Sequence, residues 1–202
     1  MNEKQSDWSF GIQYLIVCAV GLAILGMAAF TLIWSVGEAV EGIASETAAW
    51  MVAGSLFGAL FALGASTGTG LLLQKRGVDA RKWIGYSTAA GAAGAALGFA
   101  VIFSLSDPEV LPESLAGLLL GFAVGLPVGI GQWLALRQAG AAVNAWPLVT
   151  TLAFTLAFSA GFSLGGEGRE WIALSGLGLI AGAVTALGAV WLLGSRQPAP
   201  AA

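Results

Sequence analysis

Six long apolar runs, separated by short polar segments, constrain the fold of this chain more than any other feature. A helix of about 20 apolar residues crosses a hydrocarbon core about 30 Å thick. Backbone amides in lipid must bond within their own segment, and these runs lack the alternation of barrel strands. We therefore predict an all-α polytopic membrane bundle of six transmembrane helices, with residues 1–202 forming a single integral membrane domain. The predicted spans are Phe10–Val36, Ala49–Leu73, Trp83–Leu105, Leu115–Leu136, Trp146–Leu164 and Trp171–Leu193.

Composition and tryptophan placement support the same interpretation. Hydrophobic residues make up 57% of the 202 residues and charged residues 9%, against about 25% charged in soluble proteins. The spans leave no room for a separate soluble domain. An indole ring prefers the boundary between hydrocarbon and headgroups, so we expect the tryptophans at the ends of the apolar runs to mark both boundaries. They are Trp8, Trp34, Trp50, Trp83, Trp133, Trp146, Trp171 and Trp191.

Charged residues are sorted between the two sides of the predicted bundle. The tails and the connections after the second and fourth spans hold seven of the eight basic residues: Lys4, Lys75, Arg76, Arg81, Lys82, Arg137 and Arg196. The connections after the first, third and fifth spans hold eight of the eleven acidic residues: Glu38, Glu41, Glu46, Asp107, Glu109, Glu113, Glu167 and Glu170. Short loops rich in Lys and Arg stay inside. We predict a multi-pass protein of the bacterial cytoplasmic (inner) membrane with both termini in the cytoplasm.

The segment 53–99 matches the segment 116–162 at a constant shift of 63 residues. Fourteen positions are identical, whereas about five are expected by chance in a chain so rich in Ala, Gly and Leu. The matched pairs include Gly58 with Gly121 and Trp83 with Trp146. We predict an internal two-helix repeat, in which each copy is a hairpin and both copies have the same orientation. A fainter similarity near Trp191 points to a third hairpin, made of the sixth and first spans.

Small residues recur at every fourth position on two of the predicted helices. Residues four apart share one helix face, and small side chains there let two backbones approach closely in lipid. A ligand groove along the same row is the alternative. We predict helix-packing faces at Gly54, Gly58, Gly117, Gly121, Gly125 and Gly129.

The residue types that carry most enzyme chemistry are missing from the predicted spans. The sequence has no histidine and one cysteine, Cys18, and no charged residue lies near the middle of a span. Proton-coupled transport usually needs an ionisable group inside the bilayer, and metal or haem centres usually need His or Cys ligands. We therefore predict no enzymatic activity, no catalytic residue, no metal and no cofactor.

One amide and one basic loop are candidate contacts with a partner helix or with lipid. Gln132 lies near the inner boundary beside Trp133, and its side chain can make four hydrogen bonds. Cations near an anionic membrane surface contribute about 1 kcal/mol each, although a role in fixing orientation alone is the alternative for the loop. Four loop cations on a chain of net charge −3 do not predict nucleic-acid binding. The loop residues are Lys75, Arg76, Arg81 and Lys82.

The stretch from Gln132 to Arg137 has the pattern Gln-Trp-Leu-x-Leu-Arg at a helix end. It resembles uncharacterised bacterial multi-pass membrane proteins that carry this motif, and Gln13-Tyr14 is similar to an early Gln-aromatic pair of such proteins. The resemblance covers these two places. It implies a multi-pass bacterial membrane protein and no particular activity.

Two functions fit these observations. The first is a non-enzymatic membrane protein that acts by helix–helix contact, either as an accessory subunit of a membrane complex or as a homo-oligomeric scaffold. Its partners would be the lipid bilayer and other membrane helices. The second is a channel or facilitator for a small neutral or lipidic solute, which would follow a path lined by hydroxyl groups.

Overall fold

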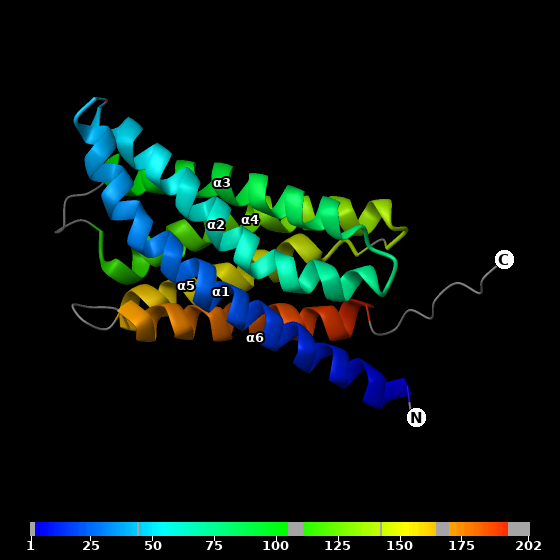
Figure 1. Cartoon of the computed structure of the whole chain (residues 1–202). Helices are drawn as coiled ribbons and strands as arrows, with labels where there is room; N and C mark the ends of the chain where they lie inside the picture. The colour runs from blue at the N-terminus through cyan, green and yellow to red at the C-terminus, as the bar shows by residue number, and fades with distance from the viewer. Residues whose placement is uncertain (1–2, 44, 105–110, 142, 165–169, 194–202) are drawn as a thin grey trace.

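The computed structural model describes residues 3–43, 45–104, 111–141, 143–164 and 170–193. Within these ranges the regular structure is entirely α-helical, which confirms the predicted all-α class for the described part of the chain. The six helices in these ranges are α1 (Glu3–Glu41), α2 (Glu46–Gln74), α3 (Ala80–Ser104), α4 (Glu113–Gln138), α5 (Trp146–Leu164) and α6 (Glu170–Leu193) (Figure 1).

These six helices are all long and apolar enough to cross a membrane. Each contains one predicted span or nearly all of it. Most helices run past the apolar stretch, because polar residues at a helix end continue the same backbone hydrogen bonding. The largest difference is at α1, which covers 39 residues, from Glu3 to Glu41, where the sequence predicts a span from Phe10 to Val36.

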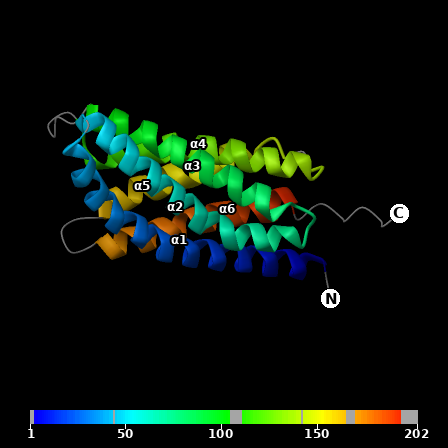
Figure 2. The same ribbon diagram turned by 45° about the horizontal axis from the view of Figure 1, so that its top comes forward.

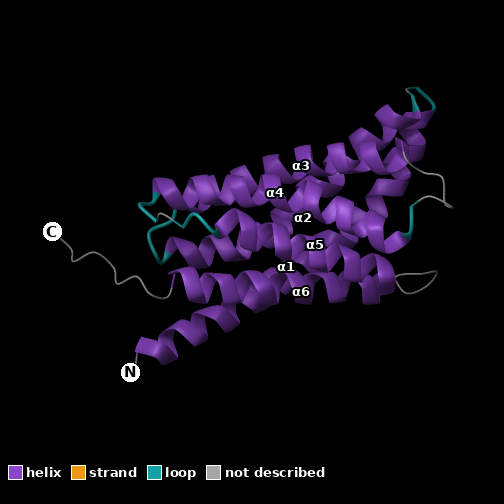
Figure 3. Ribbon diagram, turned by 180° about the vertical axis from the view of Figure 1, so that it is seen from behind, coloured by secondary structure: helices purple, strands orange, loops and turns teal. Residues whose placement is uncertain are grey.

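The helices form a closed ring in which each packs against the next along the chain and α6 packs against α1 (Figures 1 and 2). α1 begins and α6 ends at the same end of the bundle, together with the α2–α3 and α4–α5 connections (Figure 3). We call this the basic end, because its connections carry most of the basic residues. The opposite end is the acidic end, where the described acidic residues are Glu38, Glu41, Glu46, Glu113 and Glu170.

Aromatic rings fill the middle of the helix ring. Phe57 and Phe61 of α2 meet Phe154 and Phe158 of α5, although these two helices lie on opposite sides of the ring. The ring centroids of Phe61 are 5.1 Å from Phe158 and 5.8 Å from Phe154. All four side chains are buried. The bundle axis is therefore occupied by phenylalanine side chains at this level.

Glycines allow the helix backbones to approach closely. A Cβ atom built on Gly121 would lie 2.6 Å from the carbonyl oxygen of Phe154, and one built on Gly58 would collide with the carbonyl of Gly91. No larger residue fits these positions unless the helices move apart. The energetic role of these faces stays a prediction. The other predicted packing glycines, each with a neighbour within 3.0 Å of a built Cβ, are Gly54, Gly117, Gly125 and Gly129.

The two helix connections at the basic end begin with the same kind of turn. Gly77 in the first and Gly140 in the second have φ angles of +85° and +77°, a region that favours glycine. In the first turn the Val78 amide donates to the Leu73 carbonyl over 3.2 Å. In the second turn the Ala141 amide donates to the Leu136 carbonyl over 2.8 Å. This hydrogen bond closes a helix end as a Schellman motif. Both hairpins therefore reverse direction in the same way.

Candidate functional site

Several buried side chains with polar atoms gather near the basic end of the bundle. Each is at most 5% exposed. A polar atom removed from water costs free energy unless another group bonds it, so their partners determine how this region packs. We call them the polar layer: Tyr14 of α1, Thr69 of α2, Trp83 and Ser87 of α3, Gln132 of α4, and Trp146 and Thr150 of α5.

In the α2–α3 half of the polar layer, an indole and a hydroxyl are paired. Trp83 Nε1 donates to Thr69 Oγ1 over 3.1 Å. The Thr69 hydroxyl donates to the carbonyl of Ala65 over 2.9 Å, which leaves its oxygen to accept from the indole. The Thr69 hydroxyl group therefore joins α2 to α3.

In the α4–α5 half, an amide oxygen replaces the hydroxyl as acceptor. Trp146 Nε1 donates to Gln132 Oε1 over 2.9 Å, and the Thr150 hydroxyl donates to the same oxygen over 3.4 Å. A side-chain carbonyl oxygen has two lone pairs, so it can accept both bonds. Gln132 thereby joins α4 to two successive turns of α5.

The two indole hydrogen bonds occupy matching positions in the two predicted repeat units. Trp83 and Trp146 each follow their acceptor by 14 residues, and a shift of 63 residues relates both donors and both acceptors. The glycines with positive φ, Gly77 and Gly140, are related by the same shift. These correspondences support the predicted two-helix repeat. The duplication itself stays a prediction.

Ser87 is the member of the polar layer that corresponds to Thr150 at the same shift. Its side chain is fully buried, and its hydroxyl has no hydrogen-bond partner. An unpaired buried hydroxyl costs about 1–3 kcal/mol, and an internal water molecule is a common way in which proteins satisfy such a group. Within the polar layer, the Ser87 hydroxyl is therefore available to bind a neutral molecule by a hydrogen bond.

The tryptophans predicted at the membrane boundaries differ in burial, and Trp50, Trp83 and Trp146 face the interior of the bundle. These three side chains are at most 7% exposed and pack inside the bundle. A large indole fills space between helices, and for Trp83 and Trp146 the N–H bonds internally. Trp8 and Trp191 are 60% and 72% exposed, as expected for boundary residues. The two tryptophans whose side chains lie outside the described part are Trp34 and Trp171.

Gln132 and Trp133, both predicted to contact lipid or a partner helix, differ in position. Gln132 is 5% exposed and its oxygen accepts two internal hydrogen bonds, so a lipid or partner contact does not fit this side chain. Trp133 is half-buried, and its indole N–H has no hydrogen-bond partner. The Arg137 guanidinium carbon lies 5.3 Å from the centroid of the Trp133 ring. Trp133 remains a candidate contact residue.

The predicted basic loop is exposed at the basic end. Its second half is ordered by Asp79, whose Oδ1 accepts the backbone amides of the first turn of α3 at 2.9 and 3.3 Å. The Arg76 guanidinium carbon lies 4.0 Å from the centroid of the Phe10 ring in α1, a cation–π arrangement. The loop therefore contacts α1 as well as joining α2 to α3. Its exposed cations are Lys75, Arg76, Arg81 and Lys82.

Sequence reasoning singled out Gln132 but missed its bonding partners Trp146 and Thr150. The available signal was the spacing of 14 residues from Thr69 to Trp83 and from Gln132 to Trp146, which recurs at the repeat shift. A polar residue at a fixed distance before a tryptophan in both copies indicates a paired interaction.

The arrangement defines a class: an all-α protein whose six described helices, each suited to cross a membrane, close into a ring. Within the described ranges, no group of three or more His, Cys, Asp or Glu residues could hold a metal ion. Comparisons with protein-family models, with curated proteins and with solved structures find no match to this chain.

Proposed function

We propose that this chain is a multi-pass protein of the bacterial cytoplasmic membrane with the basic end in the cytoplasm. Six apolar helices of sufficient length support insertion. The exposed cations of the α2–α3 loop and Arg137 share one end with the beginning of α1 and the end of α6. Short basic loops remain on the cytoplasmic side, so both termini would lie there.

Cysteine labelling of intact cells tests this orientation. In a Cys18→Ala background, a cysteine replaces either Lys82 at the basic end or Glu38 at the acidic end, and both positions are exposed. A thiol reagent that cannot cross membranes should label the Glu38→Cys variant from outside. It should label the Lys82→Cys variant only after the membrane is opened. Labelling of Lys82→Cys in intact cells would reverse the proposed orientation.

Within the membrane, the chain acts by helix–helix contact, as an accessory subunit of a larger complex or as a homo-oligomeric scaffold. The observation that carries this proposal is the closed interior. Phe57, Phe61, Phe154 and Phe158 occupy the centre, so the surface available for an interaction is the outer face of the helix ring. The predicted packing glycines point to neighbouring helices of the same chain, and a partner would therefore use other residues.

Disulfide crosslinking in native membranes tests the contact function. Single cysteines would replace one exposed apolar residue on each of several helices, again in the Cys18→Ala background. We expect strong crosslinks to a second copy or to one stoichiometric partner from one or two helices, with the remaining helices as controls. Uniformly absent crosslinks, together with a monomer of the chain alone in mild detergent, would contradict the contact function. Suitable positions are Val52, Leu97, Phe122, Leu152 and Leu187.

A facilitator for a small neutral solute is the second candidate, and the polar layer is the observation that favours it. Hydroxyl groups in the interior, including the unpartnered hydroxyl of Ser87, can bind a neutral molecule in transit. Vesicles that contain only this chain would then take up glycerol or urea faster than empty vesicles. Ser87→Ala should change that rate. Equal uptake by both kinds of vesicle would argue against transport of these solutes.

A further inference from the structure

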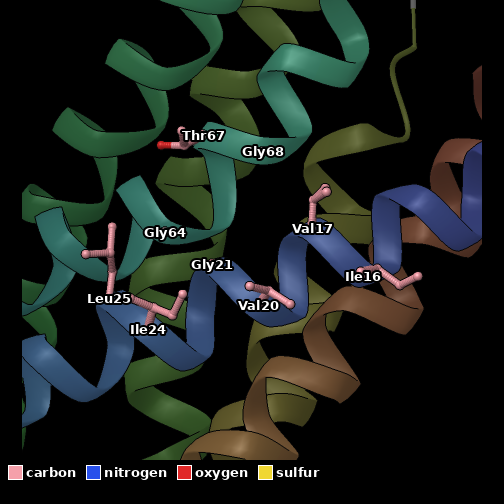
Figure 4. A pocket seen from close by; sticks show the side chains of 9 residues that line it. All are labelled: Ile16, Val17, Val20, Gly21, Ile24, Leu25, Gly64, Thr67 and Gly68. Carbon is pink, nitrogen blue, oxygen red and sulfur yellow. The ribbon is translucent and has the colours of Figure 1, made fainter.

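An apolar groove of about 460 Å³ runs along the outer face of the bundle between α1 and α2 (Figure 4). Ile16, Val20 and Ile24 line it from α1, and their side chains are 53%, 51% and 65% exposed. Gly64 and Gly68 line it from α2. The groove therefore has branched apolar side chains along one edge and glycines along the other.

The chemistry of the groove surface is that of a hydrocarbon. A Cβ built on Gly68 would lie 2.7 Å from the Cβ of Val17, which shows how closely the two helices approach beneath it. The polar side chain in the lining, Thr67, donates its hydroxyl to the Leu63 carbonyl over 2.7 Å. That donor is used within α2, so an occupant of the groove meets aliphatic groups and backbone.

Two cations lie where the line of the groove reaches the basic end. Lys75 follows Gly64 by eleven residues and Gly68 by seven, which places it on the same side of the helix. On α1, Phe10 precedes Val17 by seven residues, and the Arg76 guanidinium carbon lies 4.0 Å from the centroid of the Phe10 ring. Phe10 lies about 9 Å from Ile16 along the axis of α1, toward the basic end, because a helix rises about 1.5 Å per residue. A positive charge is thus adjacent to one end of the apolar groove.

We propose that this groove binds one acyl chain of an anionic phospholipid, whose phosphate contacts Lys75 and Arg76. The length fits, because the lining from Ile16 to Leu25 covers about 14 Å of helix and the hydrocarbon of one leaflet is about 15 Å thick. Charge complementarity selects the headgroup, since guanidinium and ammonium groups bind phosphate. An apolar partner helix would cover the groove but would supply no anion for Lys75. This inference does not depend on the proposed contact function.

The headgroup part of the proposal is tested by native mass spectrometry of the purified full-length chain in mild detergent. The probes are phosphatidylglycerol and phosphatidylcholine with identical acyl chains. We expect phosphatidylglycerol to be retained at about five-fold higher occupancy or more, the factor for one cation near the surface. Lys75→Gln combined with Arg76→Gln should remove this preference. The matched control, Arg81→Gln with Lys82→Gln, removes the same charge from the same loop and should keep most of it.

The acyl-chain part is tested by filling the groove. Val20→Trp places a large ring in the lining, and Val101→Trp places the same ring on α3 at a similar exposure, 47% against 51%. Both should fold with the wild-type unfolding temperature, because both sites are on the outer surface. Val20→Trp should lower the retention of both lipids several-fold, and Val101→Trp should not.

Three results would overturn the proposal. The first is equal retention of the two lipids by the wild-type chain. The second is an equal loss of preference in the two double charge variants, which would indicate a diffuse surface charge. The third is equal lipid retention by Val20→Trp and Val101→Trp, or release by Val20→Trp of a stoichiometric membrane protein, which would indicate a helix-docking groove. Failure here leaves the crosslinking test of the contact function unaffected.

Discussion

The indole rings of Trp83 and Trp146 contact each other inside the bundle, with centroids 5.8 Å apart and planes inclined by 59°. Each ring also donates its N–H to a residue of its own hairpin, Thr69 or Gln132. A tilted aromatic pair contributes beyond its buried area. This pair therefore connects α3 to α5 and holds the two predicted repeat units in one register at the basic end.

Loss of the Thr69 acceptor should destabilise the protein. Thr69→Val keeps the side-chain shape but leaves the Trp83 N–H buried without a partner, and we expect a loss of about 1–2 kcal/mol. Thermal unfolding in detergent, followed by tryptophan emission, measures this change. Thr67→Val is the matched control, because Thr67 bonds only to the carbonyl one turn earlier and is exposed. Equal effects of the two variants would show that the hydrogen bond from Trp83 to Thr69 does not stabilise the fold.

Gln132→Leu should cost more than Thr69→Val. The change removes one oxygen that accepts from both Trp146 and Thr150, so two donors lose a partner, and we expect a loss of about 2–3 kcal/mol. Denaturant or thermal unfolding of the detergent-solubilised chain provides the measurement. Gln138→Leu serves as a control, since Gln138 is exposed and donates to the Tyr86 hydroxyl at the surface over 3.3 Å. A Gln132→Leu variant as stable as the control would contradict the role of this amide.

Gly121→Ala should destabilise the fold through one added methyl group. The new Cβ would lie 2.6 Å from the Phe154 carbonyl oxygen, so α4 and α5 must separate, and overpacking of this kind costs about 1–3 kcal/mol. Gly85→Ala on α3 is the control, because nothing lies within 4 Å of its built Cβ. It should be neutral or slightly stabilising, since alanine favours a helix. Thermal unfolding measures both variants, and an unfolding temperature of Gly121→Ala as high as that of Gly85→Ala would contradict this prediction.

Gly140 should tolerate asparagine better than valine. Its φ of +77° strains the backbone of residues other than glycine. Nothing lies within 4 Å of a Cβ built on Gly140, so steric contact does not add to the cost of a substitution. A β-branched residue in this region should cost about 1–2 kcal/mol, whereas asparagine adopts it more readily. We expect the same order at Gly77. Equal stability of Gly140→Val and Gly140→Asn in thermal unfolding would count against this account.

The number and order of helices could be predicted from the sequence because apolar length alone determines them. The span Trp146–Leu164 coincides with α5, where a tryptophan and the end of the apolar run mark both limits. Helix ends elsewhere could not be placed from hydropathy. In α1, polar residues from Glu3 onward and up to Glu41 continue the helix beyond the predicted Phe10–Val36.

The side of each helix that faces its neighbours could not be predicted, because membrane helices are apolar on all sides. Trp146 and Trp191 have the same sequence setting at the end of an apolar run, yet one is fully buried and the other is 72% exposed. Gln132 and Trp133 are adjacent in sequence but only Gln132 points fully into the bundle. The glycine rows were identified as faces, whereas their partner helices became known only from the structure.

The contact between α6 and α1 has a consequence for chain connectivity. Because α1 starts and α6 ends at the basic end (Figure 3), a circular permutant could join residue 193 to residue 3 by a flexible linker and open the chain between α1 and α2. Every neighbouring helix pair would be kept, and the protein would become three consecutive hairpins. Such a permutant should fold, since termini near one another generally permit the rearrangement, and it would show that helix packing rather than the order of synthesis determines the ring.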